Sequence, residues 1–321
     1  MGSSQYKATK VKRYTGPAAP ESQVLSRNIP NDRSWLDTTV PYDREITNQI
    51  IEGKVLPIIL CLDVSPSMGK HNRIQQQNEA IMRFIRALCE HSKARTAVRI
   101  AFCLFTDEIV YPADLSGLKF MKLDELTFPL CPYLETTQLY IHPYSEDRQT
   151  KEFRVSVPVF RASQEQVGTH IPVAVEKSVE IMKAYLSTKE KGQRYPAFMV
   201  FTSDGNPDFS HYSADIRANY ELYTDRAARM IESVCDPRLD VKDLVVPFFV
   251  GVGDAKADYL RRFSKHFPEG VLMVNGANDR LAFEAIFKPI AQCIAQSMNM
   301  SGSTCDLLEK LCEYIEAVLS V

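Results

Sequence analysis

The stretch Ile58–Lys70, IILCLDVSPSMGK, carries an apolar run to an aspartate that is followed by two serines at alternate positions. The unbroken apolar character from Val55 to Asp63 predicts a strand with both faces covered, as in a parallel sheet between two layers of helices. Asp63 then stands at the carboxyl end of that strand, which is where open α/β sheets bind their ligands. Ser65 and Ser67 place two hydroxyls beside it.

Strands and helices alternate along most of the chain that follows. Apolar runs predict further strands at 97–106, 108–111, 197–202, 244–252 and 270–274, of which 108–111 is short and can be an antiparallel edge. Apolar residues at helical spacing predict helices over 74–88, 171–186, 214–234, 257–266 and 278–297. This order predicts an α/β fold, Rossmann-like and doubly wound, with a mostly parallel central sheet and helices on both faces.

Three segments fall outside the alternation. Residues 1–50 begin with basic residues and without acids, and we interpret them as a flexible basic N-terminal arm. Residues 112–166 interrupt the domain 51–300 as a hairpin-like insertion, in which Pro158 confines its strand to an edge or an end. Residues 301–321 are predicted to form an amphipathic helix with a capping box. That helix packs on its own domain or, as the alternative, binds a partner or a second copy.

Composition narrows the class of protein. A formal charge of −2 gives no polyelectrolyte signal, so nucleic acid is not expected as a partner. The 8 cysteines form no CxxC pair, and we interpret them as buried thiols in a reducing compartment. No apolar run approaches the ~18 residues of a membrane span. The beginning of the sequence has no signal-peptide pattern, so we expect a cytoplasmic protein.

More oxygen donors are predicted at the same edge of the sheet as Asp63. Asp204 follows a strand in the sequence TSDG, and Thr169 directly precedes a helix. The complete set offers two carboxylates and three hydroxyls, from Asp63, Ser65, Ser67, Thr169 and Asp204. These hard oxygen donors suit Mg²⁺. Because hydroxyl ligands are neutral, an ion held there keeps positive charge and attracts an external carboxylate or phosphate.

These motifs resemble the metal-ion-dependent adhesion site (MIDAS) of von Willebrand factor A domains. DVSPS at 63–67, GT at 168–169 and TSDG at 202–205 match the ligand positions of that family, within a matching region of about 55–299. The resemblance implies a bound Mg²⁺, or Mn²⁺, with the serines as direct ligands, the threonine as a ligand in one conformational state, and the aspartates often acting through water. It implies a non-enzymatic protein-interaction module, in which a partner protein donates an Asp or Glu to an open coordination position.

Among A domains, the sequence looks most similar to the stand-alone intracellular bacterial proteins of the tellurium-resistance type. That resemblance implies partners that are phosphatase- or kinase-like. The chain departs from the family pattern in its long insertion at 112–166. It also has Val167 where a second glycine is common, which implies a stiffer threonine loop.

Three other interpretations of the same residues stay open. Ser65 and Ser67 can cap the next helix while Asp204 caps a turn. A Mg-dependent phosphatase or phosphotransferase would use Asp63 as its nucleophile, but it needs a general acid at position 65, which is a serine. A scaffold with a structural or degenerate metal site would bind its partners elsewhere.

The remaining motifs predict no second site. GVGDAK at 251–256 lacks the third glycine and the Lys-Ser/Thr of a nucleotide-binding loop, so we interpret it as a strand-end turn. The 6 histidines show no zinc-binding spacing. Two of them, His170 and His211, could line the rim of the metal site, but we interpret them as surface residues. GxSxG is absent, which gives no support to a hydrolase.

Overall fold

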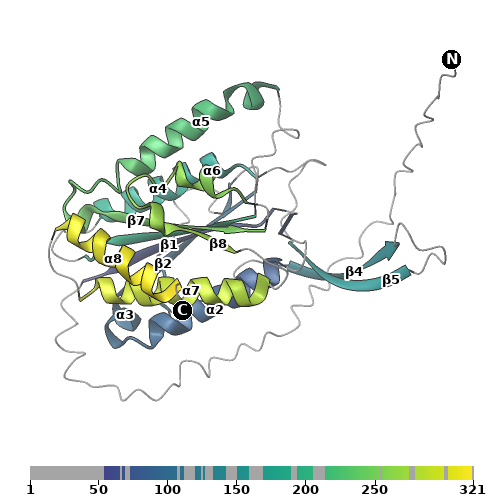
Figure 1. Ribbon diagram of the computed structural model, residues 1–321, viewed down its shortest axis with the longest axis horizontal. Coiled ribbons are helices and arrows are strands. Elements are labelled where there is room, and N and C mark those ends of the chain that lie inside the picture. Colours follow the sequence, from purple (N-terminus) through teal and green to yellow (C-terminus); the bar gives the residue numbers. More distant parts are fainter. Residues whose placement is uncertain are drawn as a thin grey trace.

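In the computed structural model of the protein, the predicted sheet is the centre of the fold (Figure 1). Its strands are β1 (Leu56–Asp63), β2 (Val98–Phe105), β3 (Ile109–Tyr111), β6 (Ala197–Ser203), β7 (Val245–Val252) and β8 (Val271–Val274). They lie in the order β3-β2-β1-β6-β7-β8, and every neighbouring pair is parallel except β2 with β3. The predicted α/β class, doubly wound and mostly parallel, is confirmed.

The structure describes residues 54–65, 67–68, 73–106, 109–111, 120–123, 126, 133–141, 150–158, 169–188, 194–204, 214–253, 255–274, 279–299 and 303–319. The basic arm predicted at 1–50 and Gly168 of the threonine loop lie outside these residues. The same holds for much of the insertion at 112–166.

Helices cover both faces of the sheet (Figure 1). One face carries α2 (Arg73–Cys89), α3 (Ser92–Ala97), α7 (Asp279–Ser297) and α8 (Thr304–Leu319). The other face carries α4 (Ile171–Ser187), α5 (Ala214–Glu232) and α6 (Ala257–Arg261). The short 3₁₀ turns η7 (Val241–Asp243) and η8 (Pro268–Gly270) precede β7 and β8. Within the described residues, no helix combines the length and the apolar character that a membrane span requires.

The two helical layers explain why β1 is apolar without interruption. Ile58 and Leu60 lie in the core on the α2 and α7 side, whereas Ile59 and Cys61 lie in the core on the α4 and α5 side. All of β1 is buried. Because successive strand residues point to opposite faces, a strand between two helical layers needs apolar side chains at every position.

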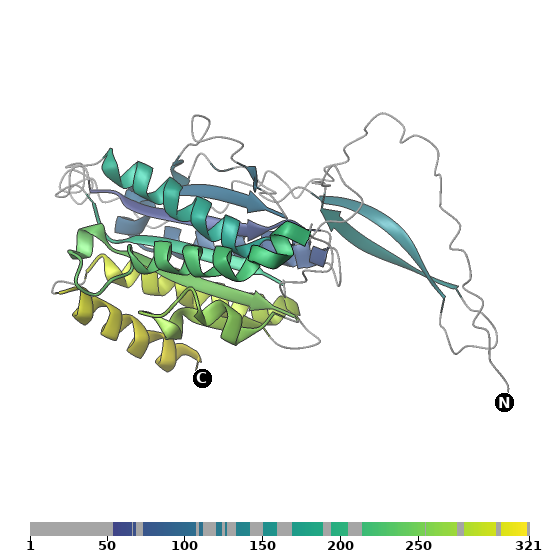
Figure 2. The same cartoon turned by 90° about the horizontal axis from the view of Figure 1, so that it is seen from above.

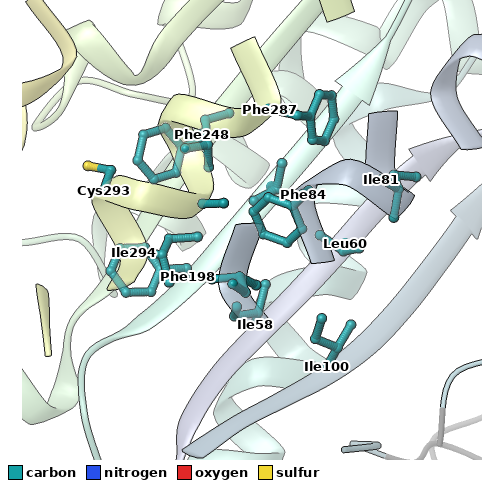
Figure 3. Packing of buried hydrophobic residues seen from close by; sticks show 14 of the residues in the cluster. Ile58, Leu60, Ile81, Phe84, Ile100, Phe198, Phe248, Phe287, Cys293 and Ile294 are labelled. Carbon is teal, nitrogen blue, oxygen red and sulfur yellow. The ribbon is translucent and has the colours of Figure 1, made fainter. Parts of the chain in front are cut away.

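Aromatic side chains fill the core between the sheet and the α2–α7 layer (Figure 3). Phe84 of α2 meets Phe287 of α7 edge to face, with ring centroids 6.1 Å apart and an interplanar angle of 86°. Phe248 of β7 packs in the same way against Phe267, at 5.5 Å. These side chains are fully buried, so they contribute much of the apolar area that holds both helices on the sheet.

The predicted helices agree with the structure to within three residues at their ends, except at the end of α6, and one further helix was not predicted. α6 ends at Arg261 instead of 266, because the backbone continues in i→i+3 hydrogen bonds, such as Ser264 N–H to the Arg261 carbonyl, rather than helical i→i+4 bonds. α3 was not predicted, since it is too short to show an apolar stripe. The capping box of α8 is confirmed: Ser303 N–H donates to Asp306 Oδ2 at 2.8 Å, and Asp306 N–H donates to Ser303 Oγ at 3.2 Å.

The described part of the insertion is an antiparallel hairpin of β4 (Tyr133–Ile141) and β5 (Thr150–Pro158). Pro158 is the last residue of its strand, as predicted. The hairpin lies beyond the carboxyl ends of the parallel strands (Figure 2), and β5 contacts α2. The insertion therefore stands on the side of the molecule where an open α/β sheet binds ligands.

We expect Phe84→Ala to lower the free energy of unfolding by about 3–5 kcal/mol, because it removes a fully buried ring and its contact with Phe287. Urea denaturation measures this change. Leu222→Ala is the matched control, since Leu222 of α5 is 58% exposed and its truncation should change stability by less than about 0.5 kcal/mol. Equal losses in the two variants would contradict this account of the core.

Candidate functional site

The site lies where the chain changes direction across the sheet. From β1 the chain passes to β2 on one side, and it later returns to β6 on the other side. The gap between β1 and β6 is therefore the topological switch point, at which doubly wound sheets form a ligand crevice. Asp63 is the last residue of β1, and Asp204 directly follows β6. The topology thus brings two carboxylates that are distant in sequence to one point.

The predicted oxygen donors lie together at this point. Ser65 Oγ is 2.8 Å from Ser67 Oγ, and Ser67 Oγ donates a hydrogen bond of 2.7 Å to Asp204 Oδ1. Thr169 Oγ1 lies 3.3 Å from Ser65 Oγ, to which it donates. Asp63 joins the cluster through the Ser65 backbone, because Ser65 N–H donates to Asp63 Oδ1 at 2.8 Å. The structure therefore places all the predicted site residues in one hydrogen-bonded cluster.

Buried polar side chains fix the ends of the two strands. Gln77 of α2 donates to the Asp63 carbonyl at 3.1 Å and accepts from Thr202 Oγ1 at 2.5 Å. Ser203 Oγ donates to Asp63 Oδ2 at 2.7 Å. One glutamine thus connects α2 to both β1 and β6, and both oxygens of the Asp63 carboxyl are hydrogen-bonded.

Thr169 is held in place by the residue that follows it. His170 N–H donates to the Thr106 carbonyl at 2.8 Å, and His170 Nδ1 accepts from Val173 N–H at 3.4 Å as the N-cap of α4. The ring lies 5.4 Å from that of Tyr220, and the residue is buried. The prediction of a surface histidine at position 170 is therefore wrong, because capping α4 draws the imidazole beneath α5. His211 lies outside the described residues.

A cation that the sequence analysis did not identify shares the site. Arg73, the first residue of α2, forms a buried ion pair with Asp204, with 2.7 Å between Nη1 and Oδ2. Its guanidinium lies against Gly253, which has φ +61°; a Cβ there would stand 2.1 Å from Arg73 Nη2. Gly253 directly follows β7 within the GVGDAK motif, so the interpretation of that motif as a strand-end turn is confirmed.

A spacing signal could have revealed both Arg73 and Gln77. The buried stripe of α2 includes Ile81 and Ile85, and steps of four residues back from Ile81 reach Gln77 and then Arg73. A polar residue that continues an apolar stripe is buried with it, and it then needs a partner. Ser203 was visible inside the TSDG motif, but its bond to Asp63 depends on which strands are neighbours.

The electrostatics of the site are dominated by two buried carboxyls. Burial in the sheet edge, and next the negative charge of Asp204, raise the pKa of Asp63 to about 7. Hydrogen bonds from Ser65 and Ser203 oppose this rise. Without a further cation, Asp63 therefore holds its proton at pH values where an exposed aspartate is ionised.

The donor set fits a small divalent ion. Neighbouring ligands in an octahedron with metal–oxygen distances of ~2.0–2.1 Å stand about 2.9 Å apart. The observed oxygen separations are 2.7 Å from Ser67 to Asp204, 2.8 Å from Ser65 to Ser67, and 3.3 Å from Thr169 to Ser65. No group of three or more His, Cys, Asp or Glu side chains suited to a metal occurs among the residues that the structure describes. An ion here would depend on hydroxyls, which suit Mg²⁺ or Mn²⁺ better than Zn²⁺.

Sequence comparison places the chain in no family: no protein-family model matches it, and no curated protein matches it. Solved structures show a distant likeness. Proximal thread matrix protein 1 from the mussel byssus is 12% identical, over 74% of this chain and 47% of that one, with a TM-score of 0.42. This chain therefore spans about half the length of the mussel protein.

Two bacterial structures give similar values. The vWF domain of the type V pili tip protein Mfa5 from Porphyromonas gingivalis is 12% identical, over 78% of this chain and 98% of that one, with a TM-score of 0.44. The PilB minor pilin from Streptococcus sanguinis is 12% identical, over 76% of this chain and 62% of that one, with a TM-score of 0.44. These scores are too low to support a function, so the site is interpreted from its own residues.

In EDTA, we expect the free energy of unfolding to fall as the pH rises from about 4 to 7. Folded Asp63 keeps its proton up to about pH 7, whereas the unfolded carboxyl loses it near 3.8, so the unfolded state binds fewer protons between these values. Asp63→Asn removes this dependence. As the pH rises from 5 to 7, the free energy of unfolding of the variant should increase relative to that of wild type by on the order of 2 kcal/mol, as measured by urea denaturation.

The exposed Asp258 of α6 supplies the control for this measurement. Asp258→Asn should keep the wild-type slope with pH, since its side chain is 94% exposed and lies outside the site. Parallel pH profiles for wild type and Asp63→Asn would contradict this prediction, because they would show that ionisation of Asp63 does not destabilise the folded state.

Proposed function

We propose that this chain is a non-enzymatic protein-interaction module of the von Willebrand factor A type. In this proposal a divalent cation, Mg²⁺ or Mn²⁺, binds at a MIDAS formed by the five predicted residues. Through that ion the chain binds an Asp or Glu of a partner protein. Cytoplasmic location, kinship with the tellurium-resistance type, and a phosphatase- or kinase-like partner remain predictions of the sequence.

One observation carries the proposal: hydroxyls from the loop after β1 and from Thr169, which precedes the N-cap of α4, converge with Asp204 in one hydrogen-bonded cluster at the switch point of the sheet. Ser65, Ser67 and Thr169 are neutral donors, so they would hold an ion without cancelling its charge. The ion would supply positive charge and a coordination position for an anionic group. The chain itself supplies orientation, because Gln77 and Ser203 fix the strand ends that carry the two aspartates.

The surroundings of the site favour a macromolecular partner. The β4–β5 hairpin lies on the side of the carboxyl ends of the strands (Figure 2), where β5 contacts α2. A partner whose acidic side chain reaches the site would approach from this side. The hairpin is therefore the described element best placed to add specificity.

The alternative interpretations receive less support from the geometry. Ser67 cannot cap α2, which begins at Arg73, and its hydroxyl donates instead to Asp204. A phosphatase would need Asp63 as an accessible nucleophile, yet the residue is fully buried and both of its carboxyl oxygens accept hydrogen bonds. A scaffold with a structural metal differs only in its partner surface, so experiment must separate it from the proposal.

Isothermal calorimetry with Mg²⁺, and separately with Mn²⁺, tests the metal half of the proposal. We expect saturable binding by wild type, a loss of at least tenfold in affinity for Ser67→Ala, and no binding by Asp63→Ala. Ser297→Ala is the matched control, because Ser297 is also a buried hydroxyl but, among the residues that the structure describes, donates to the Ile294 carbonyl of its own helix. Absence of binding by wild type, or equal affinity in Ser67→Ala, would contradict the proposal.

Selection from a random peptide-display library in Mg²⁺ tests the partner half. The binders should share an obligatory Asp or Glu, and replacement of that residue by Asn or Gln should remove binding. EDTA, or Asp63→Ala in the protein, should have the same effect. Binders that are indifferent to EDTA would show that partner recognition lies elsewhere on the chain, as in a scaffold.

A further inference from the structure

A buried arginine lies among the proposed metal ligands, and the proposed function does not need it. We propose that Arg73 is a built-in counter-cation: it stabilises the site without an ion and weakens the binding of divalent ions. This inference rests on the proposed function, since it concerns the regulation of the same site. It makes Arg73 a determinant of the ion concentration at which the site becomes loaded.

Asp204 divides its two oxygens between two kinds of donor. Oδ1 accepts from Ser67 within the hydroxyl cluster, at 2.7 Å, while Oδ2 accepts from Arg73 Nη1, also at 2.7 Å. The side chains of Arg73 and Asp204 are only 8% and 1% exposed. Water therefore screens this pair weakly, and the guanidinium interacts strongly with any other cation at the site.

Arg73 carries its positive charge at the end of α2 where the helix dipole is least favourable to a cation. Arg73 is the first residue of α2, and a positive charge at a helix N-terminus is disfavoured by the helix dipole. The buried ion pair with Asp204 compensates for this unfavourable interaction with the helix dipole. Gly253 leaves the space that the guanidinium occupies, because a Cβ there would stand 2.1 Å from Nη2.

The charges of the site give the direction of the effect. Without an ion, Arg73 balances the charge of one of the two buried carboxylates through its ion pair with Asp204. With a divalent ion, the carboxylates are neutralised by the ion and the guanidinium becomes surplus positive charge. Arg73 therefore favours the ion-free state and opposes loading. The same surplus charge is available to an acidic group of a partner once the ion is bound.

A second ion pair formed by a buried arginine provides a control at the opposite end of the strands. Arg194 precedes β6, is 6% exposed, and pairs with Asp243 of η7, which precedes β7. Its guanidinium also donates to the Leu186 carbonyl. Truncation of Arg194 removes an ion pair of a buried arginine with a carboxylate that is 27% exposed, at the amino ends of the strands, whereas the proposed site lies at their carboxyl ends.

The experiment compares wild type, Arg73→Met and Arg194→Met by calorimetry with Mg²⁺ and by thermal unfolding in EDTA and in saturating Mg²⁺. We expect Arg73→Met to bind Mg²⁺ at least tenfold more tightly than wild type. It should unfold at a lower temperature in EDTA, and Mg²⁺ should raise its unfolding temperature more than that of wild type. Arg194→Met should lose stability equally in both conditions and keep the wild-type affinity. Arg73→Gln, which can still donate to Asp204, repeats the test if Arg73→Met does not fold.

The outcomes separate the inference from the proposed function. If wild type binds Mg²⁺ and the Arg73 variants bind no more tightly, the inference is overturned and the proposed function stands. If only the Arg73 variants bind, the inference is supported and the proposed function fails for the natural chain. If no variant binds, both are overturned.

Discussion

Two carboxylates end neighbouring strands at one buried edge of the sheet, and the surrounding residues compensate for their charge. Asp63 and Asp204 meet because β1 and β6 are neighbours at the switch point, not because they are close in sequence. Unpaired carboxylates are costly to bury. Hydrogen bonds from Ser65, Ser67 and Ser203, together with the Arg73 guanidinium, meet that cost in the described structure. The same groups determine what the edge can bind.

The sequence predicted the sheet well because burial on both faces leaves a strong pattern. The continuous apolar run of β1 follows from the two cores on either side of it, and the strand ends at the polar residue that leaves them. Elements without such a pattern could not be predicted as well from the sequence. α3 is too short to show a stripe, and the end of α6 is set by local i→i+3 hydrogen bonds that no periodicity reports.

The candidate site was predictable where its residues follow strands in short motifs, and not where they act across elements. Asp63 and Asp204 could be placed at one edge from the order of strands alone. The spacing of α2 could have assigned Arg73 to the buried stripe, but its partner Asp204 depends on which helix packs beside which strand end, as does the role of His170. His170 was assigned to the surface, although capping of α4 and packing near Tyr220 bury it. Arg73 lies one residue before the predicted helix over 74–88, and its role becomes visible only through its ion pair with Asp204.

The hydroxyl cluster could bind an ion with little rearrangement, because its hydrogen bonds need not break when the ion binds. A hydroxyl has one hydrogen to donate and two lone pairs, so it can bind a cation through oxygen while its hydrogen still bonds a carboxylate. Ser67 already donates to Asp204 Oδ1, and that bond is compatible with either state. Ion binding would then be opposed mainly by repulsion between charges at the site, and little by movement of its residues. Because Gln77 and Thr202 hold the strand ends through buried hydrogen bonds, the edge has little freedom to relax its charges by moving apart. Charge compensation must therefore come from a proton on Asp63, from Arg73, or from an ion.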